Sequence, residues 1–340
     1  MNILLQGYLD RNFGDDMMIR IVADKLREHS FFISERKKEL LLPFSGDKNI
    51  FDLDKHPDAR IDAVLRVVGS GFMIRNYAGL YYSIRCLMSR GTKKIKSAVL
   101  GCNIGPFYGK LAERVSVREM ARHDLITVRD TVSLKFLNDN LKNIKTAYYP
   151  DILFSLPDMW LAPVTGEDCL GISAYRRNAN NLDTYVEMSE IADWYISGTG
   201  KNVLLFAFDT EDENDLSAAY TIKGLCKYPD KVEIVPHTGN GDNIIHGFSR
   251  CKTIIAVRFH SLILALRMGL RVIPVTYSDK TKNMLCDLGY TGISFNLDKI
   301  DAESIKQAIE KDGDGFKINP DVFRQAEGHV NTFVETILKD

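Results

Sequence analysis

Short apolar runs, rich in Val, Ile and Leu, alternate with longer amphipathic segments along the first half of the chain. The apolar runs, typical of buried strands, lie at Ile3–Leu5, Ala63–Val68, Ser97–Gly101, Leu125–Val128 and Thr146–Tyr149. The amphipathic segments have the period of helices and lie at Asp16–Glu28, Tyr77–Ser89, Lys110–Arg122 and Thr131–Asn138. Strands that alternate with helices predict a parallel sheet covered by helices on both faces.

Three prolines, Pro150, Pro157 and Pro163, then interrupt the pattern and predict a linker. The alternation restarts after them, with strands expected at Cys169–Ser173, Val203–Phe206, Val232–Val235, Thr253–Val257 and Val272–Val275. Helices are expected at Tyr185–Ile196, at Ser261–Met268 and, as one long final helix, at Asp321–Leu338.

The pattern therefore predicts an α/β protein of two Rossmann-like domains with parallel sheets and an interdomain cleft. The N-terminal domain is expected over residues 1–157, the C-terminal domain over 164–320 and a C-terminal helix over 321–340. Open α/β sheets bind their ligands beyond the carboxyl ends of the strands. Candidate chemistry is therefore sought where strands give way to helices.

The bulk composition narrows the function classes. The chain has 340 residues, enough for two domains, and a formal net charge of −1. This charge gives no strong field that would recruit nucleic acid or an anionic membrane, so any anion must be held by local cations.

The N-terminus lacks the features of a signal peptide, and no stretch is long and apolar enough to span a membrane. Six scattered cysteines without a Cys-x-x-Cys pair argue against a zinc site or a disulfide framework. We expect a cytoplasmic protein without a bound metal.

The most informative strand end is the turn that holds Arg258 and His260, just after the strand at Thr253–Val257. Cations are unfavourable at a helix N-terminus, but a bound anion would be favoured by the helix amides, by Arg258 and by His260 together. Arginine grips a carboxylate or phosphate bidentately, and histidine can donate a proton near neutral pH. The alternative is an arginine paired with a carboxylate at the core edge beside a capping histidine. Guanidinium groups already saturated by internal carboxylates would count against anion binding.

Two further strand ends carry cations. Arg129 follows the strand at Leu125–Val128, where an Arg–Asp pair, with Asp130 capping the next helix, explains it nearly as well as a substrate role does. Lys280 lies in the first turn of a helix that Ser278 or Asp279 caps. A first helical turn is the less favoured place for a lysine, which points to anion binding.

Glycines follow the first two strands of the pattern. Gly14, Gly69 and Gly71 allow tight turns and the close approach of a ligand to the backbone, although plain turns explain the last two equally well. Asp15 is expected to cap the first helix, so chemistry alone makes its use as a base the minority interpretation. The glycine pair does not complete a dinucleotide fingerprint, because position 74 is Ile.

In order and spacing, these elements resemble the motifs of the polysaccharide pyruvyl transferase family along most of the chain. The elements that carry the resemblance are Asn12-Phe13-Gly14-Asp15, Gly69-Ser70-Gly71, Val128-Arg129-Asp130 with Ser133, Pro150-Asp151, Arg258-Phe259-His260 with Ala265 and Gly269, and Tyr277-Ser278-Asp279-Lys280. Ser70 replaces a middle glycine of the family, and the polar region 35–60 matches poorly, which leaves the loops on the acceptor side undefined.

The resemblance implies a fold of the GT-B type, with the acceptor bound by the N-terminal domain and the donor by the C-terminal domain. It implies transfer of a pyruvyl group from phosphoenolpyruvate to two hydroxyls of a sugar, in the synthesis of bacterial surface polysaccharides. No tightly bound cofactor is implied. The acceptor is a sugar or a lipid-linked oligosaccharide, so peripheral contact with a membrane stays open.

Under this hypothesis His260 supplies a proton to the methylene of phosphoenolpyruvate or assists the departure of phosphate. The family motif, more than chemistry, assigns Asp15 as the base that accepts a proton from the attacking hydroxyl. The expected substrate-binding residues are Arg258, Arg129, Lys280, Gly14, Gly69 and Gly71.

Two other functions stay open. A glycosyltransferase of the same fold would use Arg258 to hold the diphosphate of a nucleotide sugar. A non-catalytic protein would bind a sugar or nucleotide without turnover, which is disfavoured because Arg129, Arg258, His260 and Lys280 are retained together. A nicotinamide-dependent oxidoreductase is disfavoured by the incomplete glycine fingerprint.

Overall fold

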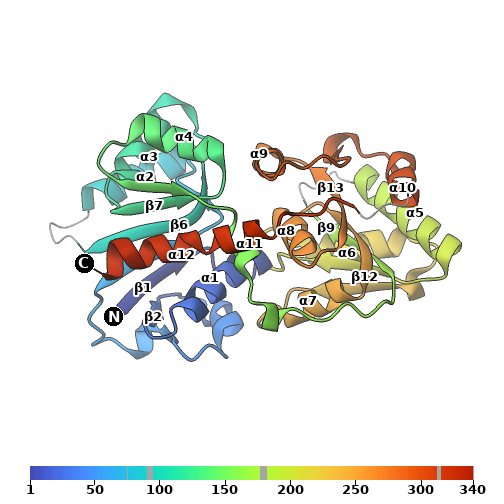
Figure 1. Ribbon diagram of the computed structural model, residues 1–340, viewed down its shortest axis with the longest axis horizontal. Coiled ribbons are helices and arrows are strands. Elements are labelled where there is room, and N and C mark those ends of the chain that lie inside the picture. The colour runs from blue at the N-terminus through green and yellow to red at the C-terminus, as the bar shows by residue number, and fades with distance from the viewer. Residues whose placement is uncertain (75, 90–94, 177–181, 312–314, 340) are drawn as a thin grey trace. The chain divides into compact units, whose positions relative to one another are not determined.

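The computed structural model describes residues 1–74, 76–89, 95–176, 182–311 and 315–339, and it divides into two compact units (Figure 1). Unit 1 comprises Met1–Tyr8, Met18–Ser155 and Phe323–Asp340. Unit 2 comprises Leu9–Met17 and Leu156–Val322. The segment 9–17, which follows the first strand, therefore packs with unit 2, and the last segment of the chain packs with unit 1.

Unit 1 is built on a parallel sheet with the strand order β3-β2-β1-β4-β6-β7-β8, and β5 pairs with β6. The strands are β1 (Asn2–Gly7), β2 (Ser30–Ile33), β3 (Ile50–Asp52), β4 (Ala63–Val67), β5 (Ser70–Gly71), β6 (Lys96–Ile104), β7 (Leu125–Val128) and β8 (Lys145–Tyr148). The helices are α1 (Phe13–Lys25), whose first turn belongs to unit 2, α2 (Tyr77–Ser89), α3 (Gly109–Met120), α4 (Thr131–Asn140), α11 (Asp321–Ala326) and α12 (Gly328–Phe333).

Unit 2 is built on a second parallel sheet, with the order β11-β10-β9-β12-β13-β14. The strands are β9 (Cys169–Ala174), β10 (Val203–Ala207), β11 (Val232–Pro236), β12 (Cys251–Ala256), β13 (Arg271–Thr276) and β14 (Phe295–Asn296). The helices are α5 (Leu182–Thr199), α6 (Asp215–Leu225), α7 (Asp242–Ser249), α8 (Phe259–Arg267), α9 (Asp279–Asp287) and α10 (Ala302–Glu310).

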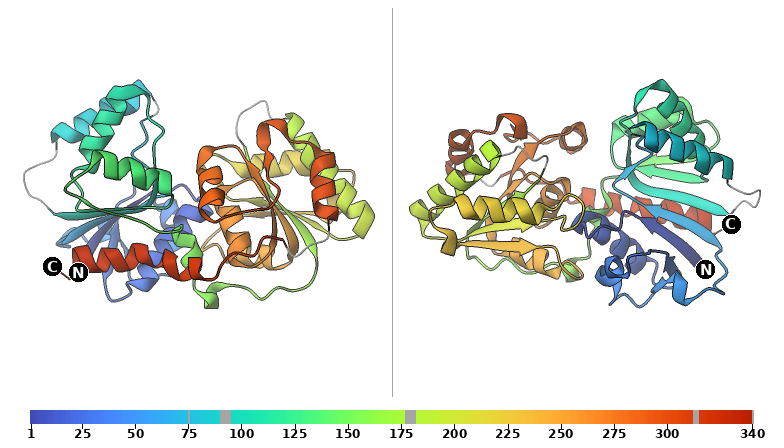
Figure 2. Two further views of the ribbon diagram at one scale, coloured as in Figure 1. Left: turned by 45° about the horizontal axis from the view of Figure 1, so that its top comes forward. Right: turned by 180° about the vertical axis from the view of Figure 1, so that it is seen from behind.

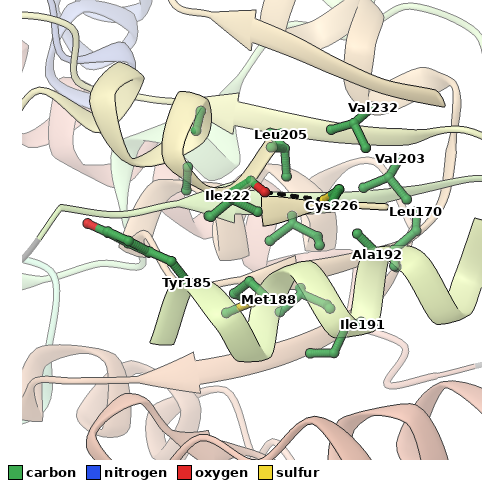
Figure 3. Packing of buried hydrophobic residues seen from close by; sticks show 14 of the residues in the cluster. Leu170, Tyr185, Met188, Ile191, Ala192, Val203, Leu205, Ile222, Cys226 and Val232 are labelled. Carbon is green, nitrogen blue, oxygen red and sulfur yellow. Dashed lines mark hydrogen bonds between the residues drawn. The ribbon is translucent and has the colours of Figure 1, made fainter. Parts of the chain in front are cut away.

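The central strands of unit 2 are buried along their whole length, as the continuous apolar runs predict. On one face Leu205 of β10 packs in a cluster with Ile222 of α6 and Ile191 of α5 (Figure 3). On the other face Phe206 packs against Phe248 of α7, with 4.5 Å between the ring centroids. Helices therefore cover both faces of this sheet (Figure 2). Each fully buried large apolar side chain contributes about 1.5–3 kcal/mol to this packing.

The strand order reverses once in each sheet. In unit 1 the chain builds outward from β1 in one direction and from β4 in the other, and in unit 2 from β9 and from β12. The loops that leave the carboxyl ends of such neighbouring strands diverge, which makes these positions the usual ligand sites of open α/β sheets. Gly69 lies just beyond β4, and Arg258 and His260 lie just beyond β12.

The predicted α/β fold with parallel sheets is confirmed, with local corrections. The first helix begins at Phe13 rather than Asp16, because residues 9–17 are fixed by unit 2. The final segment is not one regular helix: α11 ends at Ala326, α12 begins at Gly328, and Val334–Leu338 forms a π-helical turn. The break coincides with Gly328, where a Cβ would lie 2.2 Å from the Tyr149 ring.

Candidate active site at the carboxyl edge of the second sheet

The turn between β12 and α8 places Arg258 and His260 at the point where the strand order of unit 2 reverses. Arg258 is the N-cap residue of α8, and His260 lies in the first turn of the helix. No side chain caps this helix N-terminus by a hydrogen bond. Both residues are largely buried, with 6% of Arg258 and 9% of His260 exposed. The turn therefore has the position that the sequence analysis predicted.

The guanidinium of Arg258 has carboxylate partners inside unit 2. Its Nε donates to Asp215 Oδ2 at 2.7 Å, and its Nη2 donates to the other oxygen of the same carboxylate. Its Nη1 donates to Glu213 Oε2. In this structure the charge of Arg258 is therefore met by internal carboxylates, and its contact with a ligand stays a prediction.

Asp215 and its neighbour Asp209 explain why a cation is fixed here. Burial raises the pKa of the Asp209 carboxyl above its ordinary value, and it raises the pKa of the Asp215 carboxyl well above that value. The backbone N–H of Asp209 donates to Asp215 Oδ2 at 3.1 Å, and that of Arg176 donates to Asp215 Oδ1 at 3.2 Å. A hydrogen-bonded guanidinium favours the ionised carboxylate, so the bidentate Arg258–Asp215 pair is part of the framework of the site.

An aromatic pair lies beside this arginine. Arg258 Cζ lies 4.3 Å from the centroid of the Tyr175 ring, and Tyr175 stacks on Tyr277 with 4.5 Å between ring centroids. Tyr175 follows β9 and Tyr277 follows β13, so both lie at the same edge of the sheet. The sequence analysis did not single out Tyr175, although its place directly after the buried run 169–174 is the same kind of signal.

The imidazole of His260 packs directly on the backbone of Gly14. A Cβ at Gly14 would lie 1.7 Å from His260 Nδ1, so the ring occupies the space that a side chain would need. This contact lies within unit 2, which includes residues 9–17. Gly14 therefore allows the close approach of the protein's own imidazole, and its contact with a ligand stays a prediction.

Asp15 is in the first turn of α1 and not at its N-cap, which corrects the sequence prediction. The cap is Asn12, whose Oδ1 accepts a hydrogen bond from the Gly14 backbone N–H at 3.1 Å. Asp15 is partly exposed and directly follows the glycine under His260. Capping therefore does not explain Asp15, which removes one objection to a chemical role.

Residues 12–16 are tied to the strand ends of unit 2 by several bonds. The Phe13 N–H donates to the Phe208 carbonyl at 2.8 Å, and Asn12 Nδ2 donates to Asp209 Oδ2 at 3.3 Å. Asp16 Oδ2 lies 2.8 Å from His237 Nε2, and each side chain is 1% exposed. These bonds hold Gly14 against His260. Sequence reasoning missed the Asp16–His237 pair, since the two residues are far apart in the chain.

Lys280 and the N-terminus of α9 lie one strand further along the same edge. Ser278 is the N-cap residue, and no side-chain bond caps the helix. Ser278 Oγ and Thr281 Oγ1 are buried without a hydrogen-bond partner, and Thr281 is only 1% exposed. Lys280 Nζ lies 5.7 Å from the Phe259 ring, which also contacts the His260 ring at 5.4 Å. An ammonium, two hydroxyls and two uncapped helix N-termini thus gather at this edge and favour a bound anion.

Arg129 belongs to unit 1 and is part of its internal framework. Its Nη1 donates to Asp151 Oδ2 at 2.6 Å, and its Nε donates to Asn103 Oδ1 at 2.7 Å. Asp130 caps α4 by accepting from the Ser133 N–H at 2.7 Å, as the sequence analysis allowed. The ion pair is 1% exposed on each side. The structure therefore gives Arg129 a structural role in unit 1, and the substrate role stays a prediction.

Gly69 and Gly71 also lie in unit 1, and the structure gives Gly71 a packing role. A Cβ at Gly71 would lie 3.1 Å from the Cβ of Cys102, so the residue allows β5 to pack closely on β6. The Gly69 carbonyl accepts a hydrogen bond from the Asn103 N–H at 3.2 Å. A direct contact of either glycine with a ligand stays a prediction.

Two findings concern metal ligation and membrane-spanning helices. Over residues 1–74, 76–89, 95–176, 182–311 and 315–339, no group of three or more His, Cys, Asp or Glu side chains is placed to hold a metal ion. In the same part of the chain, no helix has both the length and the apolar character required to cross a membrane.

Comparisons with known proteins bear on the family and the fold. A family model for polysaccharide pyruvyl transferase matches residues 12–279. No curated protein matches the chain.

Among solved structures, UDP-GlcNAc 2-epimerase of Neisseria meningitidis bound to UDP-GlcNAc is 12% identical, with a TM-score of 0.67 and full coverage of both chains. The same enzyme of Rickettsia bellii is 13% identical, with a TM-score of 0.62 and coverage of 99% of this chain and 96% of that one. The Anabaena protein HepE in complex with UDP and glucose is 11% identical, with a TM-score of 0.55 and coverage of 99% and 98%. These likenesses confirm a two-domain α/β fold like that of GT-B enzymes.

Proposed function

The chain belongs to the polysaccharide pyruvyl transferase family, and on this premise we propose that it transfers a pyruvyl group from phosphoenolpyruvate to two hydroxyls of a sugar. The sugar is part of a bacterial surface polysaccharide or of its precursor. We assign the donor to unit 2 and the acceptor to unit 1, and we place the reaction in the cytoplasm. A lipid-linked acceptor would bring the enzyme into peripheral contact with a membrane.

One observation carries the assignment of the donor: an uncapped helix N-terminus with two unpartnered hydroxyls and an ammonium lies at the same edge of the sheet as His260. Thr281 Oγ1 and Ser278 Oγ are buried without partners at the N-terminus of α9, where Lys280 adds a positive charge. Phosphate accepts hydrogen bonds from hydroxyls and ammonium groups and is favoured at a helix N-terminus. This arrangement supports a phosphate subsite formed by Ser278, Lys280 and Thr281.

The reaction needs one proton donor near the methylene of phosphoenolpyruvate. We assign this role to His260, whose ring contacts Phe259, and Lys280 Nζ lies over the same phenyl ring. Protonation of the methylene forms the methyl group and makes the adjacent carbon electrophilic. The first sugar hydroxyl then forms a C–O bond to that carbon and loses its proton to a base, for which Asp15 is the candidate.

The second half of the reaction closes the ketal. The bond between the ketal carbon and the phosphate oxygen breaks, phosphate leaves with the bonding electron pair, and the second hydroxyl attacks the same carbon. Of the two protons that the hydroxyls lose, one replaces the proton given to the methyl group and one leaves with phosphate. The balance closes without a redox step, so phosphoenolpyruvate is the only co-substrate and no other cofactor is needed.

The experiment that tests this proposal measures phosphate release from phosphoenolpyruvate with a panel of acceptor sugars, with mass spectrometry of each acceptor for the added ketal. Phosphate and ketal are expected in equal amounts. Thermal-shift measurements with phosphoenolpyruvate and with uridine and guanosine diphosphate sugars run in parallel. Stabilisation by a nucleotide sugar alone, with sugar transfer and no ketal, would instead identify a glycosyltransferase. Binding without turnover of either donor would identify a non-catalytic protein.

A further inference from the structure

The Arg258 guanidinium has two carboxylate partners of very different exposure, in addition to a hydrogen bond with Tyr277. Nε and Nη2 are held by Asp215, whose side chain is 0% exposed. Nη1 is held by Glu213, whose side chain is 43% exposed. One partner therefore belongs to the core, and the other reaches the arginine from the surface.

Asp215 cannot leave the arginine without breaking other bonds. Its carboxylate also accepts hydrogen bonds from the backbone N–H groups of Arg176 and Asp209, and the residue begins α6. Removing it would leave Nε and Nη2 of a buried guanidinium without their partner, which is strongly unfavourable. Asp215 alone is therefore enough to keep the arginine charged and fixed.

Glu213 has no comparable anchorage. Its side chain lies on the loop 208–214, and its backbone N–H donates to Asp209 Oδ1 at 3.0 Å, which leaves the carboxylate to the arginine. The next residue, Asn214, has a left-handed backbone with φ of 47° and caps α6. A partly exposed glutamate that leaves an arginine is rehydrated by water, so its departure has a small free-energy cost.

We propose that Glu213 occupies the position on Arg258 Nη1 that the carboxylate of the donor takes, so that donor binding exchanges one carboxylate for another. This inference rests on the proposed function, because the donor there carries a carboxylate. The exchange keeps the buried arginine paired throughout, and it leaves Nη1 closed to neutral ligands. Arg258 thus becomes a selectivity element for carboxylates without ever being an unpaired cation.

The exchange makes a quantitative prediction. A competing internal group reduces the apparent affinity of a ligand by the fraction of molecules in which the site is open. If Glu213 occupies Nη1 about 90% of the time, removing its charge tightens the binding of a carboxylate about tenfold. A phosphate bound at Ser278 and Thr281 does not compete with Glu213 and gains only from the change in net charge.

The test compares the full-length protein with Glu213→Gln and with Glu211→Gln. Glu211 lies on the same loop and has the same charge, but it pairs with Arg11 at 3.0 Å and not with Arg258. Calorimetry measures the affinity for pyruvate and, separately, for inorganic phosphate, and circular dichroism checks folding. We expect Glu213→Gln to bind pyruvate about tenfold more tightly. Its affinity for phosphate, and the affinity of Glu211→Gln for pyruvate, should change much less. Glu213→Ala serves if the glutamine variant does not fold.

The outcomes separate this inference from the proposed function. Unchanged or weaker pyruvate binding in both Glu213 variants, or an equal gain in Glu211→Gln, overturns the exchange. Tighter pyruvate binding without ketal formation by any variant supports the exchange and contradicts the proposed function. If ketal forms and the KM for phosphoenolpyruvate is the same in Glu213→Gln as in the natural protein, the proposed function is supported and the exchange is overturned.

Discussion

Gly14 packs against the His260 imidazole, so a side chain at this position must displace the ring. A Cβ would lie 1.7 Å from Nδ1. Displacement of a catalytic group by about 1 Å can cost about 100-fold in rate. We expect Gly14→Ala to lower kcat by about this factor. The control is Gly198→Ala in α5, where a Cβ meets nothing within 4 Å. Equal kcat values for the two variants would show that the ring position does not matter.

His260 itself is tested by removal. His260→Ala should abolish ketal formation, because no other group is assigned to protonate the methylene, while phosphoenolpyruvate still binds through Lys280 and the helix N-termini. Binding is measured by calorimetry and turnover by phosphate release. His246→Ala, at an exposed position in α7, is the control. An active His260→Ala enzyme would refute the acid role.

Residue types at strand ends were predictable, but their partners were not. The turn at Arg258 and His260 followed from a buried strand that runs into a helix, and the structure places it there. The sequence left open whether each arginine meets a ligand or an internal carboxylate. Arg258 meets Asp215 and Arg129 meets Asp151, at separations of 43 and 22 residues. Pairings over such separations depend on tertiary packing and leave no periodic signal in the sequence.

At the scale of elements, the Arg129–Asp151 pair joins the turn after β7 to the segment after β8. Both side chains are 1% exposed, so removing one partner leaves a buried charge. We expect Arg129→Leu to lower the free energy of unfolding by about 3–5 kcal/mol. The double variant Arg129→Leu with Asp151→Leu should recover part of this loss. Urea unfolding of the two single variants and the double variant measures the coupling.

The same variants separate the two interpretations of Arg129. A structural arginine changes stability and leaves the KM for phosphoenolpyruvate of the folded enzyme as it was. A substrate-binding arginine raises that KM even in molecules that remain folded. A raised KM with unchanged urea midpoint would return Arg129 to the donor site.

Strands with continuous apolar runs followed from the sequence pattern more faithfully than strands in polar surroundings. The strands at Val203–Ala207 and Val232–Pro236 appear within one residue of prediction, because their apolar runs are continuous. The strands β2 and β3 were not predicted, and they lie in or beside the polar region 35–60. β2 pairs with β1, and β3 pairs with β2, so backbone hydrogen bonds between strands stabilise both. A strand of three or four residues beside a polar region lacks the neighbouring pattern that identified the equally short β7.

At the scale of the whole molecule, the sequence could not show which unit each segment joins. Residues 9–17 follow the first strand of unit 1 but pack with unit 2. The bonds of Phe13 to Phe208 and of Asn12 to Asp209 make this assignment, and both cross about 195 residues of sequence. Gly14 and His260 therefore lie in the same unit and in contact, although they are far apart in the sequence.

The last segment of the chain returns to unit 1 and carries a titratable group into its core. His329 of α12 is fully buried, and its Nε2 donates to the Pro150 carbonyl at 3.0 Å. Its Nδ1 lies 2.6 Å from Thr127 Oγ1 and accepts from that hydroxyl. Burial lowers the pKa of His329 from 6.5 to about 4. The folded protein therefore holds this histidine neutral where the unfolded chain protonates it.

This difference makes stability depend on pH in one direction. Between pH 6.5 and about pH 4 the unfolded chain binds a proton that the folded chain does not. The stabilisation is therefore fully present above pH 6.5 and is lost as the pH falls, by about 3 kcal/mol in total. Urea midpoints at pH 7.5, 5.5 and 4.5 should fall less steeply in His329→Gln than in the natural protein, with His56→Gln, at an exposed position, as control. Parallel slopes in all three proteins would show that the docking of the C-terminal segment does not depend on a neutral His329.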